Sequence, residues 1–496
     1  MPSPEEPSRV EEAVRFLERI SPFRELGPAQ IEDVALHALV RSYPTGTEIL
    51  HQAAEPARYL FVIHRGAVEL LDEGQLVDVL GEGDLFGISV FSKVGPALTA
   101  RAREDTECYL IESDRARAVM GTEAGLASLA AHIARWRERG AAEQHAHEIG
   151  VDDSLLRAIG AAHDITELST IVGGFPAVVA ELLDRRSDAI AIGHVVGMSI
   201  DHMTIRLIEL HVEDRGPPPV PFAWVALGSA ARHEQALNTD QDHAIAYGDD
   251  SDVGTIDTYF EGLAESVTEG LEACGIERCH GGVMAVNPAW RRTRERWRDR
   301  FREYATDPDL MGARITGIAF DYRRVTGPVD IESPLDEVIR EAGRDRAFVR
   351  RLATTALEAS PPVGRRSDIE LPRHGEHAGR IDVKHDGITI VTNLARVYGI
   401  VAGVSENRTT ERLRSAADAG VIDGTTTNDL MEAFRLLWRI RLERHSELAA
   451  RGEPPDDFVD PSGLSRVTER ALGGSLRVIG DAQAALAGQL GLRHRR

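Results

Sequence analysis

The pattern of hydrophobic and polar positions changes several times along the chain. Over residues 10–120 it begins with helical spacing, which predicts helices at Glu11–Ile20 and Ala29–Val40. Short alternating or apolar runs separated by glycine-containing turns follow, and they predict strands that form a small antiparallel barrel or jelly roll. The predicted strands are Glu48–Leu50, Tyr59–Ile63, Ala67–Leu71, Gln75–Leu80, Leu98–Ala102 and Cys108–Ile111.

The rest of the chain divides into three further parts. Apolar residues return at helical spacing over residues 121–215, which predicts an all-helical connector. Three consecutive prolines, Pro217–Pro219, then prevent any helix from continuing, because proline lacks the backbone donor and fixes φ. Residues 216–330 mix strands and helices, and residues 331–496 are again mostly helical. The pattern therefore predicts a multidomain α+β protein with a β jelly roll, a helical connector, an α/β domain and a helical C-terminal domain.

Composition and charge limit the classes of function. Of the 496 residues, 42% are hydrophobic and 28% charged, so the chain can bury several hydrophobic cores. The net charge of −23 argues against a protein that coats nucleic acid by neutralising phosphates. Three cysteines are too few for a disulfide scaffold and favour a reducing, cytoplasmic compartment. The acidic N-terminus and apolar runs of at most about a dozen residues predict neither a signal peptide nor a membrane span.

The strongest candidate for chemistry begins directly after the prolines. Phe222–Leu227 is predicted to be a buried strand that ends at Gly228 and Ser229, and a short helix follows. A glycine before a helix N-terminus lets a phosphate approach backbone N–H groups. On the next predicted strand, Asp240 and Asp242 are two residues apart and therefore point to the same face. Such a pair can hold Mg²⁺ against a nucleoside triphosphate, although most isolated pairs of this kind are solvated surface groups.

This order of a Gly-Ser turn, a short helix and an Asp-x-Asp strand resembles the DNA polymerase β nucleotidyltransferase superfamily. The resemblance implies a third carboxylate on a later strand, and the candidate is Asp321, which lies between apolar neighbours. The alternative for Asp321 is a structural salt bridge with Arg323 or Arg324, since an unpaired buried carboxylate is costly.

Longer motifs extend the resemblance over nearly the whole chain. They are Gly228-Ser-Ala-Ala-Arg232-His-Glu234-Gln235, Thr239-Asp-Gln-Asp242, Gly281-Gly-Val-Met-Ala-Val-Asn287-Pro288-Ala-Trp290, Phe320-Asp-Tyr-Arg323, Gly379-Arg-Ile-Asp-Val-Lys384-His-Asp-Gly387, Asn393-Leu-Ala-Arg396-Val-Tyr398 and Thr410-x-Arg412-Leu413. Together they resemble a bacterial family of predicted signal-transduction nucleotidyltransferases, related to the protein-PII uridylyltransferase. Many members of that family carry a pair of CBS domains after the sensor domain, whereas this chain is predicted to have only helices there.

The N-terminal strands carry a resemblance of their own. Pro44-x-Gly46-x-x-Ile49, Tyr59–Ile63, Gly66-Ala67-Val68 and Gly83-Asp84-Leu85-Phe86-Gly87 resemble the cyclic-nucleotide-binding domain, which that family typically has at its N-terminus. The usual phosphate-binding cassette offers a glutamate to the ribose and an arginine to the cyclic phosphate. Here Ile88 and Gly95 align with those positions. We therefore expect no cyclic-nucleotide binding in the usual mode, and instead a docking or dimerisation role such as a homodimer contact.

Two weaker candidates have simpler explanations. Cys274, Cys279 and His280 supply only part of a zinc site, because no fourth ligand is evident. Aromatic and basic residues interleave over residues 290–304, as they do in nucleic-acid binders. The helical spacing of the aromatic residues instead favours a packed face, with the arginines outside it or toward the triphosphate.

The predicted function is transfer of a nucleoside monophosphate from a nucleoside triphosphate (NTP) to an acceptor, a hydroxyl group on a protein, with release of pyrophosphate. Asp240, Asp242 and Asp321 would form the catalytic site and hold Mg²⁺ or Mn²⁺. The alternative is a non-catalytic regulatory protein that binds a nucleotide or a partner. Neither a membrane nor nucleic acid is an expected partner. The residues expected to contact the nucleotide are Gly228, Ser229, Arg232, Lys384 and Arg396.

Overall fold

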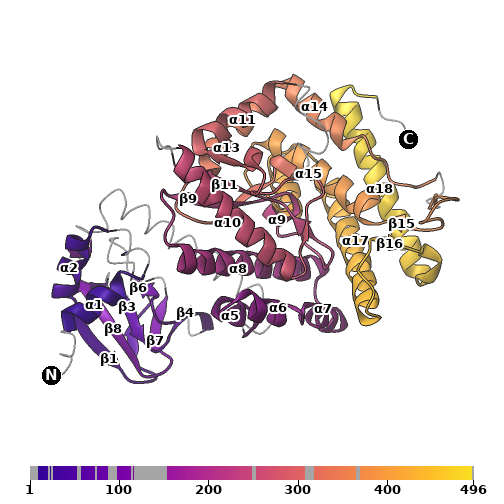
Figure 1. Cartoon of the computed structure of the whole chain (residues 1–496). Coiled ribbons are helices and arrows are strands. Elements are labelled where there is room, and N and C mark those ends of the chain that lie inside the picture. Colours follow the sequence, from indigo (N-terminus) through magenta and orange to yellow (C-terminus); the bar gives the residue numbers. More distant parts are fainter. Residues whose placement is uncertain are drawn as a thin grey trace. The chain divides into compact units, whose positions relative to one another are not determined.

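The computed structural model describes residues 9–20, 23, 26–52, 57–72, 75–87, 96, 98–112, 115–116, 154–248, 253–307, 318–364 and 369–493. Contacts between Cα atoms divide the chain into two compact units, Met1–His145 and Ala146–Arg496. Figure 1 shows the elements of both units.

The first unit contains two antiparallel sheets and two helices. One sheet has the strand order β1-β8-β3-β6 and the other β2-β7-β4-β5, with antiparallel pairing between neighbours. This confirms the predicted small antiparallel β structure. The elements are α1 (Arg9–Leu17), α2 (Pro28–His37), β1 (Leu39–Tyr43), β2 (Glu48–Leu50), β3 (Tyr59–Arg65), β4 (Val68–Asp72), β5 (Gln75–Leu80), β6 (Leu85–Phe86), β7 (Thr99–Ala102) and β8 (Thr106–Glu112).

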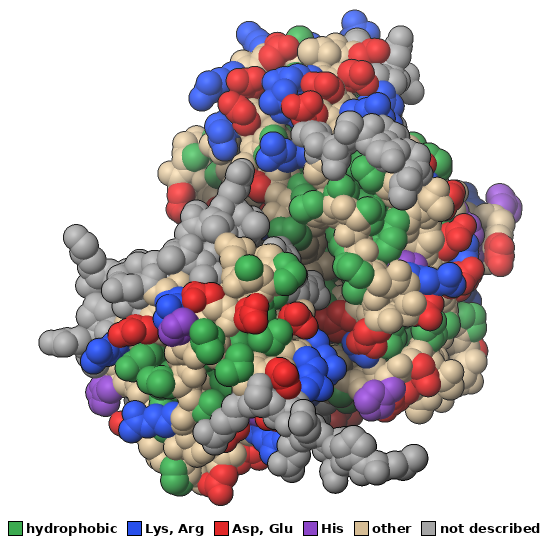
Figure 2. Space-filling view, turned by 60° about the vertical axis from the view of Figure 1, so that its left-hand side comes forward, with side chains coloured by type: hydrophobic (Ala, Val, Ile, Leu, Met, Phe, Trp, Pro, Cys, Tyr) green, Lys and Arg blue, Asp and Glu red, His purple; other side chains and the backbone are tan. Residues whose placement is uncertain are grey.

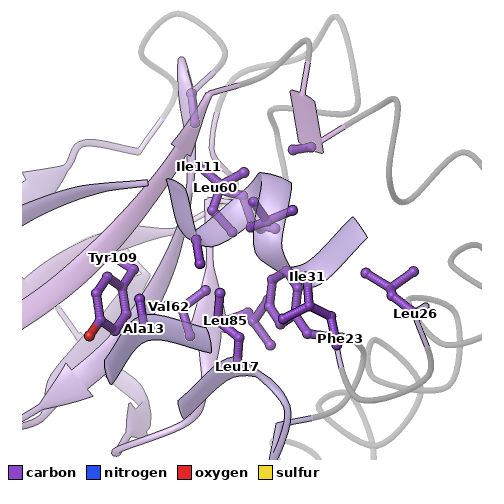
Figure 3. Packing of buried hydrophobic residues seen from close by; sticks show 14 residues of the cluster. Ala13, Leu17, Phe23, Leu26, Ile31, Leu60, Val62, Leu85, Tyr109 and Ile111 are labelled. Carbon is purple, nitrogen blue, oxygen red and sulfur yellow. The ribbon is translucent and has the colours of Figure 1, made fainter. Parts of the chain in front are cut away.

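Strand β3 contributes side chains to two hydrophobic clusters, one on each of its faces. Leu60 and Val62 belong to the cluster that includes the helix residue Leu17, shown in Figure 3. Phe61 and Ile63 point the other way and belong to a second cluster with residues of both sheets. Because successive side chains of a strand face opposite sides, an unbroken apolar run fits a strand that is covered on both faces.

Sequence pattern alone misplaced two elements of this unit. The helix predicted over Ala29–Val40 ends at His37, and the apolar residues that follow it form β1. Strand β1 pairs with β8, so its residues are fixed by a partner some seventy positions away, for example Leu39 opposite Leu110. The short strand β6 was also not predicted, because two residues are too few to show a period.

The second unit contains a mixed four-stranded sheet with the order β13-β11-β9-β14. Strand β9 pairs antiparallel with β11 and β14, and β11 pairs parallel with β13. Strand β10, which directly precedes β11 in the sequence, forms a small parallel pair with β12. The elements are β9 (Phe222–Leu227), α9 (Gly228–Ala231), β10 (Asp240–Gln241), β11 (His243–Tyr247), α10 (Val253–Ala273), β12 (Glu277–Arg278), β13 (Arg291–Thr293), α11 (Arg294–Thr306) and β14 (Tyr322–Thr326).

Helices precede and follow this sheet in the same unit. Helix α8 ends at Arg215, directly before the predicted proline boundary. The C-terminal helices pack together, with α17 against α18, α7 and α8. A π-helical turn, Lys384–Ile388, leads into α15. The helices are α5 (Ser154–Ala161), α6 (Ile165–Val172), α7 (Phe175–Asp184), α8 (Ala189–Arg215), α13 (Glu332–Ala342), α14 (Arg346–Ala356), α15 (Thr389–Ala402), α16 (Thr409–Asp418), α17 (Gly424–Ala450) and α18 (Arg466–Leu490), with short strands β15 (Ile381–Asp382) and β16 (Phe458–Val459).

Two observations bear on the expected partners. Within the described part of the chain, Ile165–Asp184 alone has the length and apolar composition of a membrane span, a weak criterion that core helices also meet. In the structure this stretch is divided into α6 and α7 at Gly173 and Gly174. On the face shown in Figure 2, acidic and basic side chains of the described residues are interspersed.

Candidate active site

The turn after β9 is shaped by Gly228. This residue has a φ of +57°, which side-chain-bearing residues rarely adopt. A Cβ atom at Gly228 would also lie 3.1 Å from Oδ2 of Asp242. Its backbone N–H donates to the carbonyl of Asp321 at 2.9 Å. The short helix α9 begins at Gly228, directly after β9. Glycine is therefore needed here both for backbone conformation and for the close approach of a carboxylate.

Asp240 lies in β10 and Asp242 directly before β11, and a carboxylate oxygen of each lies within 4.8 Å of the other. Asp240 is half-buried, whereas Asp242 is 9% exposed and its Oδ1 has no hydrogen-bond partner within the described part of the chain. Burial, and after it the repulsion from Asp240, raise the pKa of Asp242 to about 7. Two close carboxylates with an unpartnered buried oxygen are a place where a cation would be strongly stabilised.

A cavity of about 310 Å³ opens over this carboxylate pair. One wall comes from the turn after β9 and the start of β11, and the other from the π-helical turn and α15. The structure thus brings together residues more than 150 positions apart in the sequence. The predicted site residues that line the cavity are Gly228, Ser229, Arg232, Asp240, Asp242, Lys384 and Arg396.

Asp321 does not occupy the predicted position of a third metal ligand. Its carboxylate is completely buried and accepts hydrogen bonds from Arg232, Arg396 and Arg412, and it does not line the cavity. Burial by itself would raise the pKa of Asp321, but the three guanidinium groups outweigh it and hold the pKa far below its usual range. We therefore revise the prediction for Asp321 from metal ligand to ion-pair partner.

The salt-bridge alternative for Asp321 had the right type of contact but the wrong partners. Arg323 pairs with Asp201 at 2.7 Å, and Arg324 lies 3.6 Å from Glu332. Asp321 lies directly before β14, and arginines from α15 and α16 reach its carboxylate instead. This contact between distant segments leaves no local pattern in the sequence.

Glu234 links Arg232 to the C-terminal helices. Its Oε2 accepts from Nε of Arg232 at 2.7 Å, and its Oε1 accepts from the backbone N–H of Thr409 at 2.7 Å. Thr409 is the first residue of α16, so a carboxylate from the turn before β10 satisfies the free N–H at the start of that helix. Arg232 is thereby held between Glu234 and Asp321 while it lines the cavity.

Lys384 and His385 lie on the opposite wall. Lys384 is half-buried, and its charge favours the ionised form of Asp242. No ion pair to Lys384 is found within the ranges that the structure describes. His385 is exposed, donates from Nδ1 to Oδ2 of Asp382 at 2.9 Å, and was not predicted as a site residue. Short π-helical turns such as this one often occur at functional sites.

The remaining candidates are placed differently. Cys279 lies beside Asp240 and Asp242 instead of forming a site with Cys274 and His280. The aromatic residues directly before β13 and in α11 form a packed face, which confirms that interpretation of their spacing. They are Trp290, Trp297, Phe301 and Tyr304, all buried and in contact as neighbouring rings. The two altered cassette positions, Ile88 and Gly95, lie outside the described residues.

Three segments of the chain match known protein families. Residues 174–310 match the model described as "Putative nucleotidyltransferase DUF294", and residues 346–490 match "Putative nucleotidyltransferase substrate binding domain". Residues 40–123 match "Cyclic nucleotide-binding domain". The cavity is built from both DUF294 segments, since residues 228–242 belong to the first and residues 384–396 to the second. The chain is therefore similar to DUF294 nucleotidyltransferase domains over residues 174–310 and 346–490, and to a cyclic nucleotide-binding domain over residues 40–123.

Similarity to individual proteins is low. A search of curated proteins gave no match. Among solved structures, the regulatory subunit of a cAMP-independent protein kinase A from Trypanosoma brucei is 19% identical with a TM-score of 0.22; the match covers 23% of this chain and 42% of that one. A cyclic nucleotide-binding-like protein from Brucella abortus is 22% identical with a TM-score of 0.20, covering 22% and 99%. The sensor domain of the regulator DNR from Pseudomonas aeruginosa is 19% identical with a TM-score of 0.24, covering 26% and 92%.

Proposed function

We propose that the cavity binds an NTP and transfers its nucleoside monophosphate to an acceptor, with pyrophosphate as the leaving group. The observation that supports this most is the convergence of the Asp240–Asp242 pair with cationic side chains from a distant segment on one cavity. A triphosphate requires both a cation-binding carboxylate pair and positive side chains. Arg232, Lys384 and Arg396 supply the positive charge.

The carboxylate pair fits Mg²⁺ or Mn²⁺. Asp242 has a buried Oδ1 without a hydrogen-bond partner among the described residues, and carboxylate oxygens are the ligands that these ions prefer. A divalent cation bound there would neutralise phosphate oxygens and stabilise the charge that develops on the transferred group. Asp240 and Asp242 would hold it, and Gly228, which has no side chain, admits the Asp242 carboxylate beside the turn.

The arginines around Asp321 orient the triphosphate. Arg232, Arg396 and Arg412 share two carboxylates, Asp321 and Glu234, so the cluster keeps more positive than negative charge. Arg232 and Arg396 belong to both the cluster and the cavity wall. Side chains fixed by buried ion pairs lose little conformational freedom when they bind phosphate, which favours an ordered nucleotide.

The acceptor is proposed to be a hydroxyl group on a protein, as in protein-PII uridylyltransferase, whose motifs this chain resembles. The role is proposed to be in signal transduction, and it is supported by the matched descriptions of residues 346–490 as a substrate-binding domain and of residues 40–123 as a cyclic nucleotide-binding domain. A cytoplasmic location and a homodimer contact through the N-terminal domain complete the proposal.

A non-catalytic nucleotide-binding protein is the second candidate. It is favoured by one observation, the neutralisation of Asp321, which leaves the cavity without the third carboxylate that the resemblance implies. Such a protein would bind NTP and release no pyrophosphate.

One experiment separates the two candidates. The purified full-length protein is incubated with each α-labelled NTP, with Mg²⁺ or Mn²⁺, and with a lysate of its source cells. Transfer predicts a labelled macromolecule and released pyrophosphate, both lost in Asp240→Asn. Nucleotide binding measured by calorimetry, without label transfer or pyrophosphate under any of these conditions, would select the non-catalytic protein.

A further inference from the structure

Cys279 reaches the carboxylate pair through the pairing of two short strands. Strand β10 pairs in parallel with β12, with Asp240 opposite Glu277 and Gln241 opposite Arg278. The next residues in the same register are Asp242 and Cys279. A carboxylate oxygen of Asp240, a carboxylate oxygen of Asp242 and Sγ of Cys279 all lie within 4.8 Å of one another. Cys279 is 7% exposed, so its sulfur is enclosed together with the carboxylates.

Two backbone N–H groups point toward the sulfur of Cys279, where burial and the neighbouring Asp242 otherwise raise the pKa of the thiol to about 11. The backbone N–H of Gly281 donates to its Sγ at 3.3 Å, and the backbone of Val283 provides a second hydrogen bond. N–H donors to sulfur stabilise the negative charge of a thiolate ligand. The carbonyl of Val283 accepts from the N–H of His243 at 3.1 Å, so the loop that carries these donors is fixed to β11.

Asp242 gives independent evidence for a cation site. Its Oδ1 is buried and has no hydrogen-bond partner among the described residues, although a buried acceptor without a partner is costly. Asp242 is more than nine-tenths buried and lines the same cavity as Asp240. A metal ion between these carboxylates and the sulfur would satisfy this oxygen.

We infer that Cys279 is a thiolate ligand of a divalent transition metal held by Asp240 and Asp242, and that this site binds Co²⁺ or Zn²⁺ in preference to Mg²⁺. On binding, the Cys279 S–H bond breaks, a sulfur–metal bond forms, and the proton passes to the solvent. Thiolate selects softer ions, because Mg²⁺ prefers oxygen ligands alone. The inference deepens the function proposed for the same cavity and depends on it for its biological use, but metal binding is measured without nucleotide.

Cobalt spectroscopy on the full-length chain tests this inference. The protein is freed of metal with EDTA, exchanged into buffer and titrated with Co²⁺. Wild type should develop the near-ultraviolet sulfur-to-cobalt charge-transfer band with one equivalent of ion. The band should be absent in Cys279→Ser and retained in Cys274→Ser, which is the matched control because Cys274 lies outside the cluster. No band in wild type, or an unchanged band in Cys279→Ser, would overturn the inference.

Calorimetry and a second variant guard against a folding defect. Cys279→Ser should weaken Co²⁺ and Zn²⁺ binding about tenfold or more while Mg²⁺ binding changes little; an equal loss for Mg²⁺ contradicts a thiolate ligand. If Cys279→Ser does not fold, the Cys108→Ser/Cys274→Ser double variant decides, because Cys279 is then the only thiol in the chain. That variant must keep the band. A wild-type band without any nucleotide transfer would refute the proposed function and leave this inference standing.

Discussion

Asp242 is the residue at which charge and burial conflict most within the cavity. Its folded-state pKa of about 7 lies above the ordinary value of about 3.9, so folding disfavours the ionised form. Without metal, in EDTA, Asp242 is protonated below about pH 4 in both the folded and the unfolded chain and does not change the free energy of unfolding. As the pH rises from 4 toward 7, the unfolded chain ionises first, so Asp242 increasingly destabilises the folded wild type. At low pH, Asp242→Asn should have the same free energy of unfolding as wild type. Near pH 8 its free energy of unfolding should be higher by about 1–3 kcal/mol, which a higher melting temperature would report. A difference that stays constant with pH would contradict this.

Activity should respond to the same carboxylates in the opposite direction. Asp240→Asn and Asp242→Asn remove charge that stabilises the transition state, and loss of one such group commonly costs about 10²–10³ in rate. Because the two aspartates act on one cation, the double variant should be about as slow as either single variant. Rates of pyrophosphate release check this. If wild type transfers a nucleotide and either single variant keeps its rate, the carboxylate pair is not the catalytic site.

The presence of a lysine at position 384, in a chain that otherwise uses arginine almost exclusively, indicates a specific role for its ammonium group. Lysine occurs only at Lys93 and Lys384 in a chain with 57 lysines and arginines, and an ammonium group is a compact donor that a guanidinium fork does not copy. Lys384→Arg should weaken NTP binding in calorimetry because the longer fork no longer fits the π-helical turn beside the cavity. Lys93→Arg is the matched control and should bind as wild type does. Unchanged affinity in Lys384→Arg would make Lys384 an ordinary surface cation.

At the scale of elements, the sequence predicted the strands and turns of the site but not what joins them. Local apolar runs predict the strand before Gly228 and the strand after Asp242. The spacing of two residues between Asp240 and Asp242 predicts that their carboxylates lie close together. The contacts of Arg396 and Arg412 with Asp321 join α15 and α16 to the sheet, and no local pattern records such a contact. Cys279 was missed as a neighbour of Asp242 for the same reason, since only the pairing of β10 with β12 brings the two together.

The cluster around Asp321 gives a test that separates a structural carboxylate from a metal ligand. Asp321→Asn leaves three buried guanidinium groups without their shared counter-charge, and breaking a buried ion pair in this way typically costs about 3–5 kcal/mol. The variant should therefore melt well below wild type even in EDTA. Asp240→Asn, which removes a carboxylate from the cavity instead, should melt at or above wild type under the same conditions. Equal melting of Asp321→Asn and wild type would return Asp321 to the list of metal ligands.

At the scale of the whole molecule, the order of domain types was readable from changes of period, since two-residue alternation gives way to helical spacing and then to a mixture. The division into two compact units could not be predicted from these changes of period. Of the predicted connector, residues 121–215, the described helices α5–α8 belong to the same unit as the sheet β13-β11-β9-β14, with α8 packed against α10 and α17. Amphipathic spacing shows that a helix has a buried face but not which element covers that face.

The N-terminal unit carries the last prediction. Its match to the cyclic nucleotide-binding domain is a match of fold family, whereas ligand affinity depends on two polar anchors that the sequence replaces with Ile88 and Gly95. Each charge-assisted hydrogen bond is typically worth about 1.5–3 kcal/mol, so losing both should weaken binding by roughly 10²–10⁴. We expect calorimetry to show no saturable cAMP or cGMP binding below roughly millimolar concentration. The Ile88→Glu/Gly95→Arg double variant, which restores both anchors, should gain affinity, and a micromolar dissociation constant for the wild type would show that this domain senses cyclic nucleotide by other contacts.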